Sequence, residues 1–517
     1  MSSVGTESAS AGFSLVEDGW IPVLTLQRQA RLVGLRELLT DAHTIWRITA
    51  DSAAQQVALM RLVLALAHRI LDGPRDTAQW EQVRAAPCLD AEAVHAYLDA
   101  HATRFLLGGP TPFMQTPGLR TTRGNGPSSD GLEKLLPDAD PDRLFTTRVG
   151  VSDLDPAEAA RELVALHAYD VGGIKTGLAD DPETKGGKGY PRGSGGAART
   201  LQVHLHGETL WESLTLNLTP LGEDASLPFW EQPPLTPGDR GQEPGGRLEL
   251  LTWHSRRVLL AHDGARVTGA LIGQGDRLDA YQPSEQHTIY RPNPNRAARA
   301  GEPLVPRKPP PGRTAWQMLP ELLPDASQDG TRPPKVLAQR PAAPADPRTV
   351  DLSLTWADQG SKGSVWVDMS SDTLTIPGAA LTRADVRETL VRAAEATQQA
   401  STALATLAAN LVLAAGGHDQ AQGARDKAHA DATHALDEPT RTWIATLAPA
   451  GDLDQELHDW HTQAHSIITA LGDELAEQAG PAAWRGRVIC GRRITTPEAL
   501  GWFYKDLAKA LPRTRHK

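Results

Sequence analysis

Up to about residue 377, short apolar stretches of helical and of strand-like spacing follow one another along the chain. Helical spacing predicts helices over residues 53–71, 89–101 and 156–167, and the first has so few polar positions that it should be buried. Shorter apolar or alternating stretches predict strands over residues 20–23, 200–205, 210–218 and 348–355. Residues 248–260 are expected to form two strands around a turn, and Asp263-Gly264 is a hairpin signal. This mixture predicts a mixed α/β domain.

After residue 377 the pattern changes to long Ala-rich stretches of helical spacing. Helices are predicted over residues 381–415, 423–436, 440–447, 454–479 and 496–511, with Gly416-Gly417 ending the first. Short loops between such helices favour an antiparallel bundle. The predicted fold class is therefore α+β. A large mixed α/β N-terminal domain covers residues 13–377, an all-α C-terminal four-helix bundle covers residues 378–517, and residues 1–12 form a disordered tail.

A glycine-rich, basic stretch interrupts this pattern over residues 171–199. Gly172, Gly173 and Gly177 lie in its first part, where Lys175 is interleaved with them. Glycine lets the backbone approach a ligand closely, and exposed N–H groups beside Lys or Arg suit phosphates or the floor of a nucleic-acid groove. A flexible loop with solvated charges is the alternative. The ordered elements predicted on both sides favour a functional loop.

Composition restricts the class of protein. With 517 residues the chain is too long for one core, and its net charge of −11 argues against a protein that coats nucleic acid over its whole surface. A local basic groove stays possible. The two cysteines, Cys88 and Cys490, lie far apart, which fits a reducing compartment. A polar N-terminus and the absence of a long apolar run predict a cytoplasmic protein without a membrane segment.

A second basic stretch, over residues 291–313, carries Arg291, Arg296 and Lys308 among several prolines. A loop stiffened by proline can hold positive charge against a phosphate chain, and a solvated connector is an equal alternative.

Signals for catalysis or metal binding are weak. His204 and His206 share one face of a predicted strand, and His458, His461 and His465 share one face of a predicted helix. The sequence has no Gly-x-Ser-x-Gly, His-Glu-x-x-His or phosphate-loop motif. We therefore expect a binding protein without a catalytic residue, metal or cofactor. A metal- or phosphate-dependent enzyme that uses these histidines is the alternative.

Several stretches, taken in order, resemble the large subunit of the type I-E CRISPR surveillance complex Cascade, the CasA family. They are Trp20-Ile-Pro-Val, Pro112-Phe-Met-Gln-Thr, Leu132-Glu-Lys-Leu-Leu, Leu144-Phe145, Gly173-Ile-Lys-Thr-Gly-Leu, the Leu-x-Leu-x-Leu run ending at Leu218, and Asp358-Gln359. The resemblance implies a non-catalytic subunit that recognises the protospacer-adjacent motif (PAM) in double-stranded DNA through the minor groove. It also implies that the subunit helps to open the duplex for R-loop formation and recruits the helicase-nuclease. The guide RNA, the other Cascade subunits, target DNA and the helicase-nuclease are then its partners, and a scaffold that only joins subunits is a third interpretation.

The resemblance also implies roles for particular residues. They are a glycine loop in the minor groove (Gly172, Gly173 and Gly177, with Lys175), a glutamine wedge (Gln359, next to Asp358), a basic finger (Arg291, Arg296 or Lys308) and a contact with the 5′ handle of the guide (Phe145, with Thr147 nearby). The minor groove offers few distinguishing groups, so a loop without side chains can read it by steric exclusion.

Overall fold

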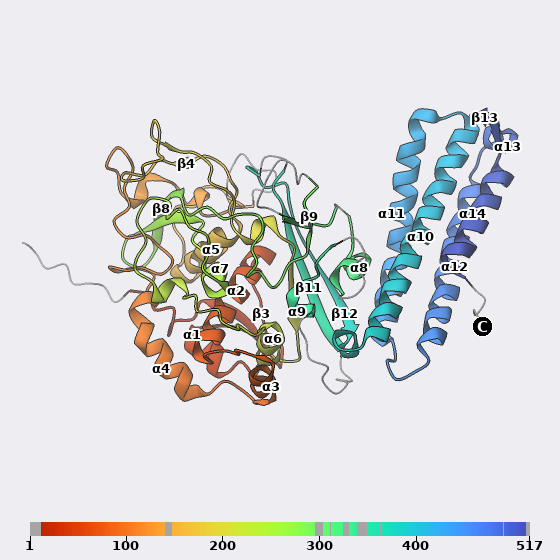
Figure 1. Cartoon of the computed structure of the whole chain (residues 1–517). Coiled ribbons are helices and arrows are strands. Elements are labelled where there is room, and N and C mark those ends of the chain that lie inside the picture. The colour runs from red at the N-terminus through yellow and green to blue at the C-terminus, as the bar shows by residue number, and fades with distance from the viewer. Residues whose placement is uncertain are drawn as a thin grey trace, which may run out of the picture. The chain divides into compact units, whose positions relative to one another are not determined.

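The computed structural model describes residues 12–139, 147–294, 303–310, 312–323, 330–338, 349–360, 363–489 and 491–512. Residues 1–11 of the predicted tail lie outside this set. The chain folds into two compact units (Figure 1). The first comprises residues 1–308, 334–339 and 353–371, and the second comprises residues 309–333, 340–352 and 372–517.

The first unit mixes helices with short strands. Its elements are β1 Ile21–Thr25, β2 Ala30–Val33, α1 Leu35–Thr40, β3 Ile45–Ile48, α2 Ala53–Ile70, α3 Thr77–Ala85, α4 Ala91–His101, α5 Pro156–Tyr169, β4 Lys175–Thr176, β5 Lys188–Gly189, β6 Gln202–His206, α6 Leu210–Asn217, α7 Arg247–Leu251, β7 Arg256–His262, β8 Val267–Gln274, β9 Tyr290–Pro292, β10 Leu304–Pro306 and α9 Lys335–Ala338. Strands β11 Thr349–Asp358 and β12 Asp368–Pro377 have residues in each unit, and β11 pairs with both β12 and β6.

Helix α2 forms the centre of the first unit. Its side chains are buried from Val57 to Ala67 on every face, as the near-absence of polar positions predicts. Ser52 caps it by accepting a hydrogen bond from the Gln55 backbone N–H. Helix α5 packs against α2 and has Pro156 in its first turn. Its last residue is Tyr169, and its C-cap, Asp170, directly precedes the glycine-rich stretch.

The β7–β8 hairpin lies beside this stretch. Its strands are antiparallel, with Arg256 opposite Gln274 at the open end. Gly264 has φ +92° in the turn, a conformation that favours glycine, so the predicted hairpin turn is confirmed.

Two predictions in the first unit are wrong. Residues 210–218 form helix α6, not a strand, because Thr209 caps a helix and both faces of the segment are buried. The polar side chains that made the sequence alternate bond inside the unit; Asn217 donates to the Leu205 carbonyl, for example. Residues 248–260 begin in helix α7 before β7, so the first of the two predicted strands is absent.

The second unit is dominated by long helices. Its elements are α8 Leu319–Leu322, α10 Ala384–Ala415, α11 Ala421–Thr446, α12 Leu453–Glu477, α13 Pro481–Arg485, β13 Arg487–Ile489, β14 Arg492–Ile494 and α14 Thr496–Ala510. Helix α10 packs against α11, α12 and α14, as Figure 1 shows. The two helices predicted over residues 423–447 are one, because Pro439 is accommodated inside α11. The predicted fold class, a mixed α/β N-terminal part followed by a helical C-terminal part, is confirmed.

A glycine cap and a buried hydrogen bond are two local features of this helical unit. Gly416 ends α10 in the left-handed conformation, with φ +96°. The fully buried Trp460 donates to Thr397 Oγ1 at 3.0 Å and so links α12 to α10. Within the described residues, no helix combines the length and the apolar character that a membrane crossing needs.

A candidate nucleic-acid interface at the glycine segment

Two segments that are far apart in the sequence meet in the first unit. The first, Val171–Gly173, is here called the glycine segment. The second follows β11, and its described residues 358–360 and 363–367 are here called the 358–367 loop. The Gly172 N–H donates to the Gly363 carbonyl at 2.7 Å. A Cβ atom added to Gly173 would lie 3.6 Å from the Ser364 carbonyl oxygen. The predicted glycine loop and the predicted wedge are therefore neighbours.

The open end of the β7–β8 hairpin fixes the glycine segment. Arg256 is 1% exposed, and its Nη2 donates to the carbonyls of Val171 (2.6 Å) and Gly193 (3.0 Å). Its cross-strand partner Gln274 donates through Nε2 to the Gly173 carbonyl at 2.9 Å. The carbonyls of Val171 and Gly173 thus point inward, toward buried donors that hold them in place.

Asp170 supplies the negative charge of this arrangement. Its buried carboxylate accepts from Arg256 Nε at 2.5 Å and forms an ion pair with Lys175 Nζ at 2.6 Å. Burial alone would raise the pKa of Asp170, but the charges of Lys175 and Arg256 lower it to about 2. Lys175, a predicted DNA-binding residue, is thus engaged with this carboxylate.

Two hollows open to solvent lie along the glycine segment. The first hollow is lined by Gly172, Pro191, Gly193, Ser194, Arg199, Ala280, Arg291, Pro306, Lys308, Asp358, Gln359, Gly360 and Gly363. The second hollow is lined by Asp130, Lys134, Val171, Gly173, Ile174, Lys175, Thr176, Gly187, Pro191, Ile272 and Ser364. The first hollow therefore brings together five of the residues predicted to contact DNA.

The basic candidates differ in what their side chains do. Lys308 Nζ donates to the carbonyls of Ala198 and Ala357, both at 2.7 Å, and burial lowers its pKa to about 8. Arg291, on the short strand β9, is exposed. Arg296 lies outside the described residues, as does Phe145. The structure thus separates an inward-directed lysine from an exposed arginine.

Gln359 and Asp358 face in different directions. Gln359 is 5% exposed, and its Nε2 donates to the Tyr169 carbonyl at 3.1 Å. Asp358 is exposed, and its carboxylate accepts from the Gly360 N–H at 2.9 Å. Gln359, the predicted wedge, is thus hydrogen-bonded to the last residue of α5, next to the glycine segment.

Two other predicted residues have local structural contacts. Gly177 pairs with Gly187 across the turn that follows β4, where an added Cβ would come within 2.5 Å of the Gly187 carbonyl carbon. Gly177 lines neither hollow. Thr147 donates to the Asp138 carboxylate at 2.5 Å.

The sequence analysis missed the residues that position the segment, namely Asp170, Arg256 and Gln274. One signal was available. Arg256 and Arg257 stand next to each other in an otherwise apolar strand pattern, and a charged residue in a buried strand is expected to have a specific partner.

The alternative enzyme hypothesis names two sets of histidines, His204 with His206 on β6 or those on α12. His204 stacks on His287 with ring centroids 4.8 Å apart, and burial lowers the pKa of both. His206 bonds to the Ser353 hydroxyl at 2.8 Å, while His461 is a buried residue of α12. Within the described ranges, no three His, Cys, Asp or Glu side chains gather closely enough to hold a metal ion.

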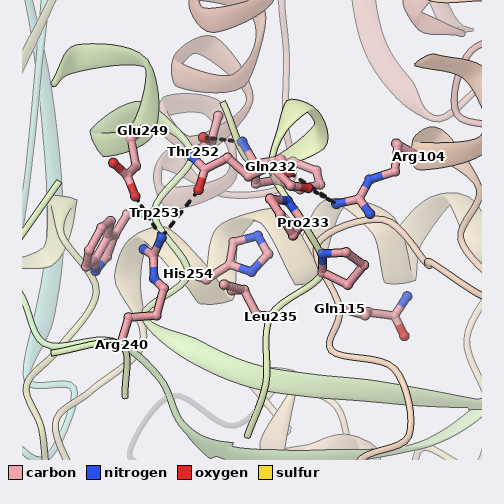
Figure 2. A pocket seen from close by; sticks show the side chains of 12 residues that line it. Arg104, Gln115, Gln232, Pro233, Leu235, Arg240, Glu249, Thr252, Trp253 and His254 are labelled. Atoms are coloured by element: carbon pink, nitrogen blue, oxygen red, sulfur yellow. Dashed lines mark hydrogen bonds and ion pairs between the residues drawn. The ribbon is translucent and has the colours of Figure 1, made fainter. Parts of the chain in front are cut away.

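A smaller pocket in the same unit is shown in Figure 2. Its polar groups mostly bond one another or the backbone: Arg240 pairs with Glu249 at 2.8 Å, and Arg104 donates to the Phe229 carbonyl at 3.1 Å (Figure 2). Burial keeps the pKa of His254 well below its usual value, so this residue is neutral. None of the predicted DNA-binding residues that the structure describes lines this pocket.

Comparison with known proteins agrees with this architecture. Residues 14–471 match the family described as CRISPR-associated protein Cse1. The CRISPR-associated protein CasA/Cse1 of Thermus thermophilus is 33% identical over 282 residues, so the chain spans about half (52%) of that curated relative's length. The crystal structure of Thermobifida fusca Cse1 has a TM-score of 0.87 at 32% identity, covering 97% of this chain and 99% of that one.

Two further structures share the fold. Cse1 from Acidimicrobium ferrooxidans has a TM-score of 0.84 at 29% identity, with coverage of 97% and 99% of the two chains. A chain of a structure described as a CRISPR RNA-guided surveillance complex has a TM-score of 0.68 at 22% identity, with coverage of 96% and 99%. The chain therefore belongs to the Cse1 (CasA) family, the large-subunit family of the type I-E CRISPR complex Cascade.

Proposed function

We propose that this chain is a non-catalytic subunit of a cytoplasmic RNA-guided surveillance complex that recognises the PAM of double-stranded DNA through the minor groove. It helps to open the duplex for the guide RNA and offers a docking surface to the helicase-nuclease. Family membership supports the place in the complex. The hydrogen bond between Gly172 and Gly363 is the observation that carries the DNA-reading role, because it joins both predicted DNA-reading segments at one hollow.

The backbone of the glycine segment is the part of the chain that would read the minor groove. The minor groove is about 6 Å wide and presents few groups that distinguish base pairs. A backbone without side chains can approach it where no exocyclic amine projects, and the inward hydrogen bonds of Val171 and Gly173 keep that backbone in a fixed position. Sequence recognition beyond the motif then passes to pairing between guide and target.

Arg291 is the basic residue that enters the groove or contacts its phosphates in this proposal. Arg291 is exposed at the first hollow. The ammonium group of Lys308, in contrast, donates hydrogen bonds to two backbone carbonyls. Arg291→Ala should weaken DNA binding by the complex and reduce the slope of log affinity against log salt by about 1, the value expected for one phosphate contact. Arg485→Ala, at an exposed arginine of α13, is the matched control. An unchanged salt slope in Arg291→Ala would remove this residue from the interface.

Gln359 stays the predicted wedge, and its amide must first leave the Tyr169 carbonyl to reach a base pair. Gln359→Ala should slow strand opening next to the motif, which permanganate footprinting of the target duplex reports. Unchanged R-loop formation would contradict the wedge role.

The test of the proposed function is a gel-shift comparison with the reconstituted complex on targets with and without the motif. We expect tight binding only when the motif is present and this chain is included. Binding that ignores the motif would instead favour a scaffold that only joins subunits. Stoichiometric metal in the purified chain would favour the alternative enzyme that uses His204 and His206.

A further inference from the structure

The pocket of Figure 2 lies where helix α7 leads into β7, and positive charge gathers around it. Two of the arginines there are matched by two carboxylates. Arg240 pairs through Nη1 with Glu249 at 2.8 Å and through Nε with Asp276 at 2.7 Å, and Arg257 pairs with Asp276 at 2.5 Å. These four charges therefore balance one another.

A third arginine of the pocket, Arg104, adds a charge that nothing balances. Its half-buried guanidinium donates through Nη2 to the carbonyls of Phe229 (3.1 Å) and Gln232 (3.3 Å), and its buried Nε has no hydrogen-bond partner. Burial lowers the pKa of Arg104, and no carboxylate of the described chain offsets this effect. A cation removed from water without an opposite charge is costly, so this arginine calls for a counter-charge.

His254 brings further unpartnered polar atoms to the same pocket. Its ring is 4% exposed, stacks on His167 with centroids 4.6 Å apart and lies against Phe229 at 5.0 Å. Neither ring nitrogen has a hydrogen-bond partner in the part of the chain that the structure describes. Figure 2 shows the ring between the guanidinium groups of Arg240 and Arg104. A neutral imidazole here offers one N–H donor to the pocket.

We propose that this pocket is a binding site for a halide ion, chloride under ordinary conditions, held by Arg104 and His254. The ion accepts from the Arg104 Nε–H and from the imidazole N–H, and it supplies the missing counter-charge. The pocket admits little more than a water-sized group, and Phe229, Pro233 and Leu235 form apolar walls. These walls suit a weakly hydrated halide better than phosphate, which needs more donors.

The ion would tie a long loop to the core of the first unit. Arg104 already holds this loop at Phe229 and Gln232, and Arg257 holds it through the carbonyls of Thr236 (2.6 Å) and Gly238 (2.8 Å). None of the described residues predicted to bind DNA lines the pocket. Chloride should therefore stabilise the first unit, and this inference does not depend on the proposed function.

The first arm of the test locates the ion. The full-length unaltered chain is crystallised in sodium bromide, and anomalous scattering at the bromine edge marks bound bromide. We expect an anomalous peak within hydrogen-bonding distance of Arg104 Nε and of one His254 nitrogen. No variant is needed for this arm, so its result does not depend on how a substitution folds.

The second arm measures thermal melts in chloride and in gluconate at equal ionic strength, since gluconate is too large for the pocket. A Kd of about 10 mM would raise the Tm of the unaltered chain by about 2 °C in about 100 mM chloride. Arg104→Gln should lose this rise. So should His254→Phe, which keeps a ring against His167 and Phe229 but has no nitrogens. Arg485→Gln, at an exposed arginine of α13, is the matched control and should keep it.

Three outcomes would overturn the proposal. One is a water molecule, with no anomalous peak, bonded to Arg104 and His254 in the bromide crystals. Another is the same Tm for the unaltered chain in chloride and in gluconate. The last is a chloride response of equal size in Arg104→Gln, His254→Phe and Arg485→Gln, which would indicate a general effect of salt.

Discussion

Replacing Gly173 by alanine should weaken recognition of the motif without destabilising the fold. The backbone at Gly173 is not left-handed. Among the residues that the structure describes, the added Cβ would meet one heavy atom within 4 Å, the Ser364 carbonyl oxygen at 3.6 Å. Alanine therefore fits, and by restricting the unfolded chain it should stabilise the protein by about 0.4–1 kcal/mol. The same methyl group occupies the space through which the backbone would approach a base edge. Since a good contact with a base is worth about 1–3 kcal/mol, loss of half of it should weaken motif-dependent binding about 2–13-fold.

The assay pairs a thermal melt of the purified chain with gel shifts of the reconstituted complex. We expect an unchanged or slightly higher Tm together with weaker binding to motif-bearing DNA, and unchanged binding to DNA that lacks the motif. Gly177→Ala is the contrasting variant, because its Cβ would come within 2.5 Å of Gly187 backbone atoms and should destabilise the fold. If Gly173→Ala binds the motif normally, or loses affinity for both DNAs equally, then close backbone approach at this position is refuted.

Three further predictions concern the supports of the site and the core of each unit. Arg256→Lys removes donors to the Val171 carbonyl and should cost about 2–4 kcal/mol, seen as a lower Tm, while also weakening motif-dependent gel shifts. Glu162→Gln should become more stable relative to the unaltered chain as pH rises from 5 to 8 in thermal melts. Burial raises the pKa of Glu162 from 4.5 to about 7, so the stability provided by its neutral form is complete below pH 4.5 and lost as pH rises through 7. Gly472→Ala would overlap the Phe503 ring between α12 and α14 and should destabilise the helical unit by about 1–3 kcal/mol in chemical denaturation.

For each of these three variants, one outcome would contradict the prediction. An unaltered Tm in Arg256→Lys would mean that a lysine ammonium group stabilises the fold as well as the hydrogen bonds of the Arg256 guanidinium do. A stability difference for Glu162→Gln that does not change with pH would show that this carboxyl has an ordinary pKa in the folded chain. Gly501→Ala is the control for Gly472→Ala, because no atom of the described part of the chain lies within 4 Å of its added Cβ. Equal effects of the two variants would exclude overlap with the ring.

The long helices could be predicted from the sequence because their signal is local. Helices α2 and α10 follow from apolar residues at helical spacing, and Gly416 ends α10 in a left-handed conformation that glycine adopts without the steric penalty of a Cβ atom. The strand predicted at 210–218 was wrong because periodicity reports burial only when one face meets water. Both faces of α6 are buried, so its polar residues mark internal hydrogen bonds and not a solvent side.

The glycines at 172 and 173, the amide at 359 and, through the order of the motifs, the family could all be recognised in the amino-acid sequence. How these residues act together depends on the tertiary structure. It brings the Gln359 amide to the Tyr169 carbonyl, 190 residues away in the sequence. It also brings the carbonyls of Val171 and Gly173 within hydrogen-bonding distance of Arg256 and Gln274. The same structure turns Lys308 inward while leaving Arg291 exposed. A side chain's partners and its access to solvent depend on segments distant in the sequence, and local spacing carries no information about them.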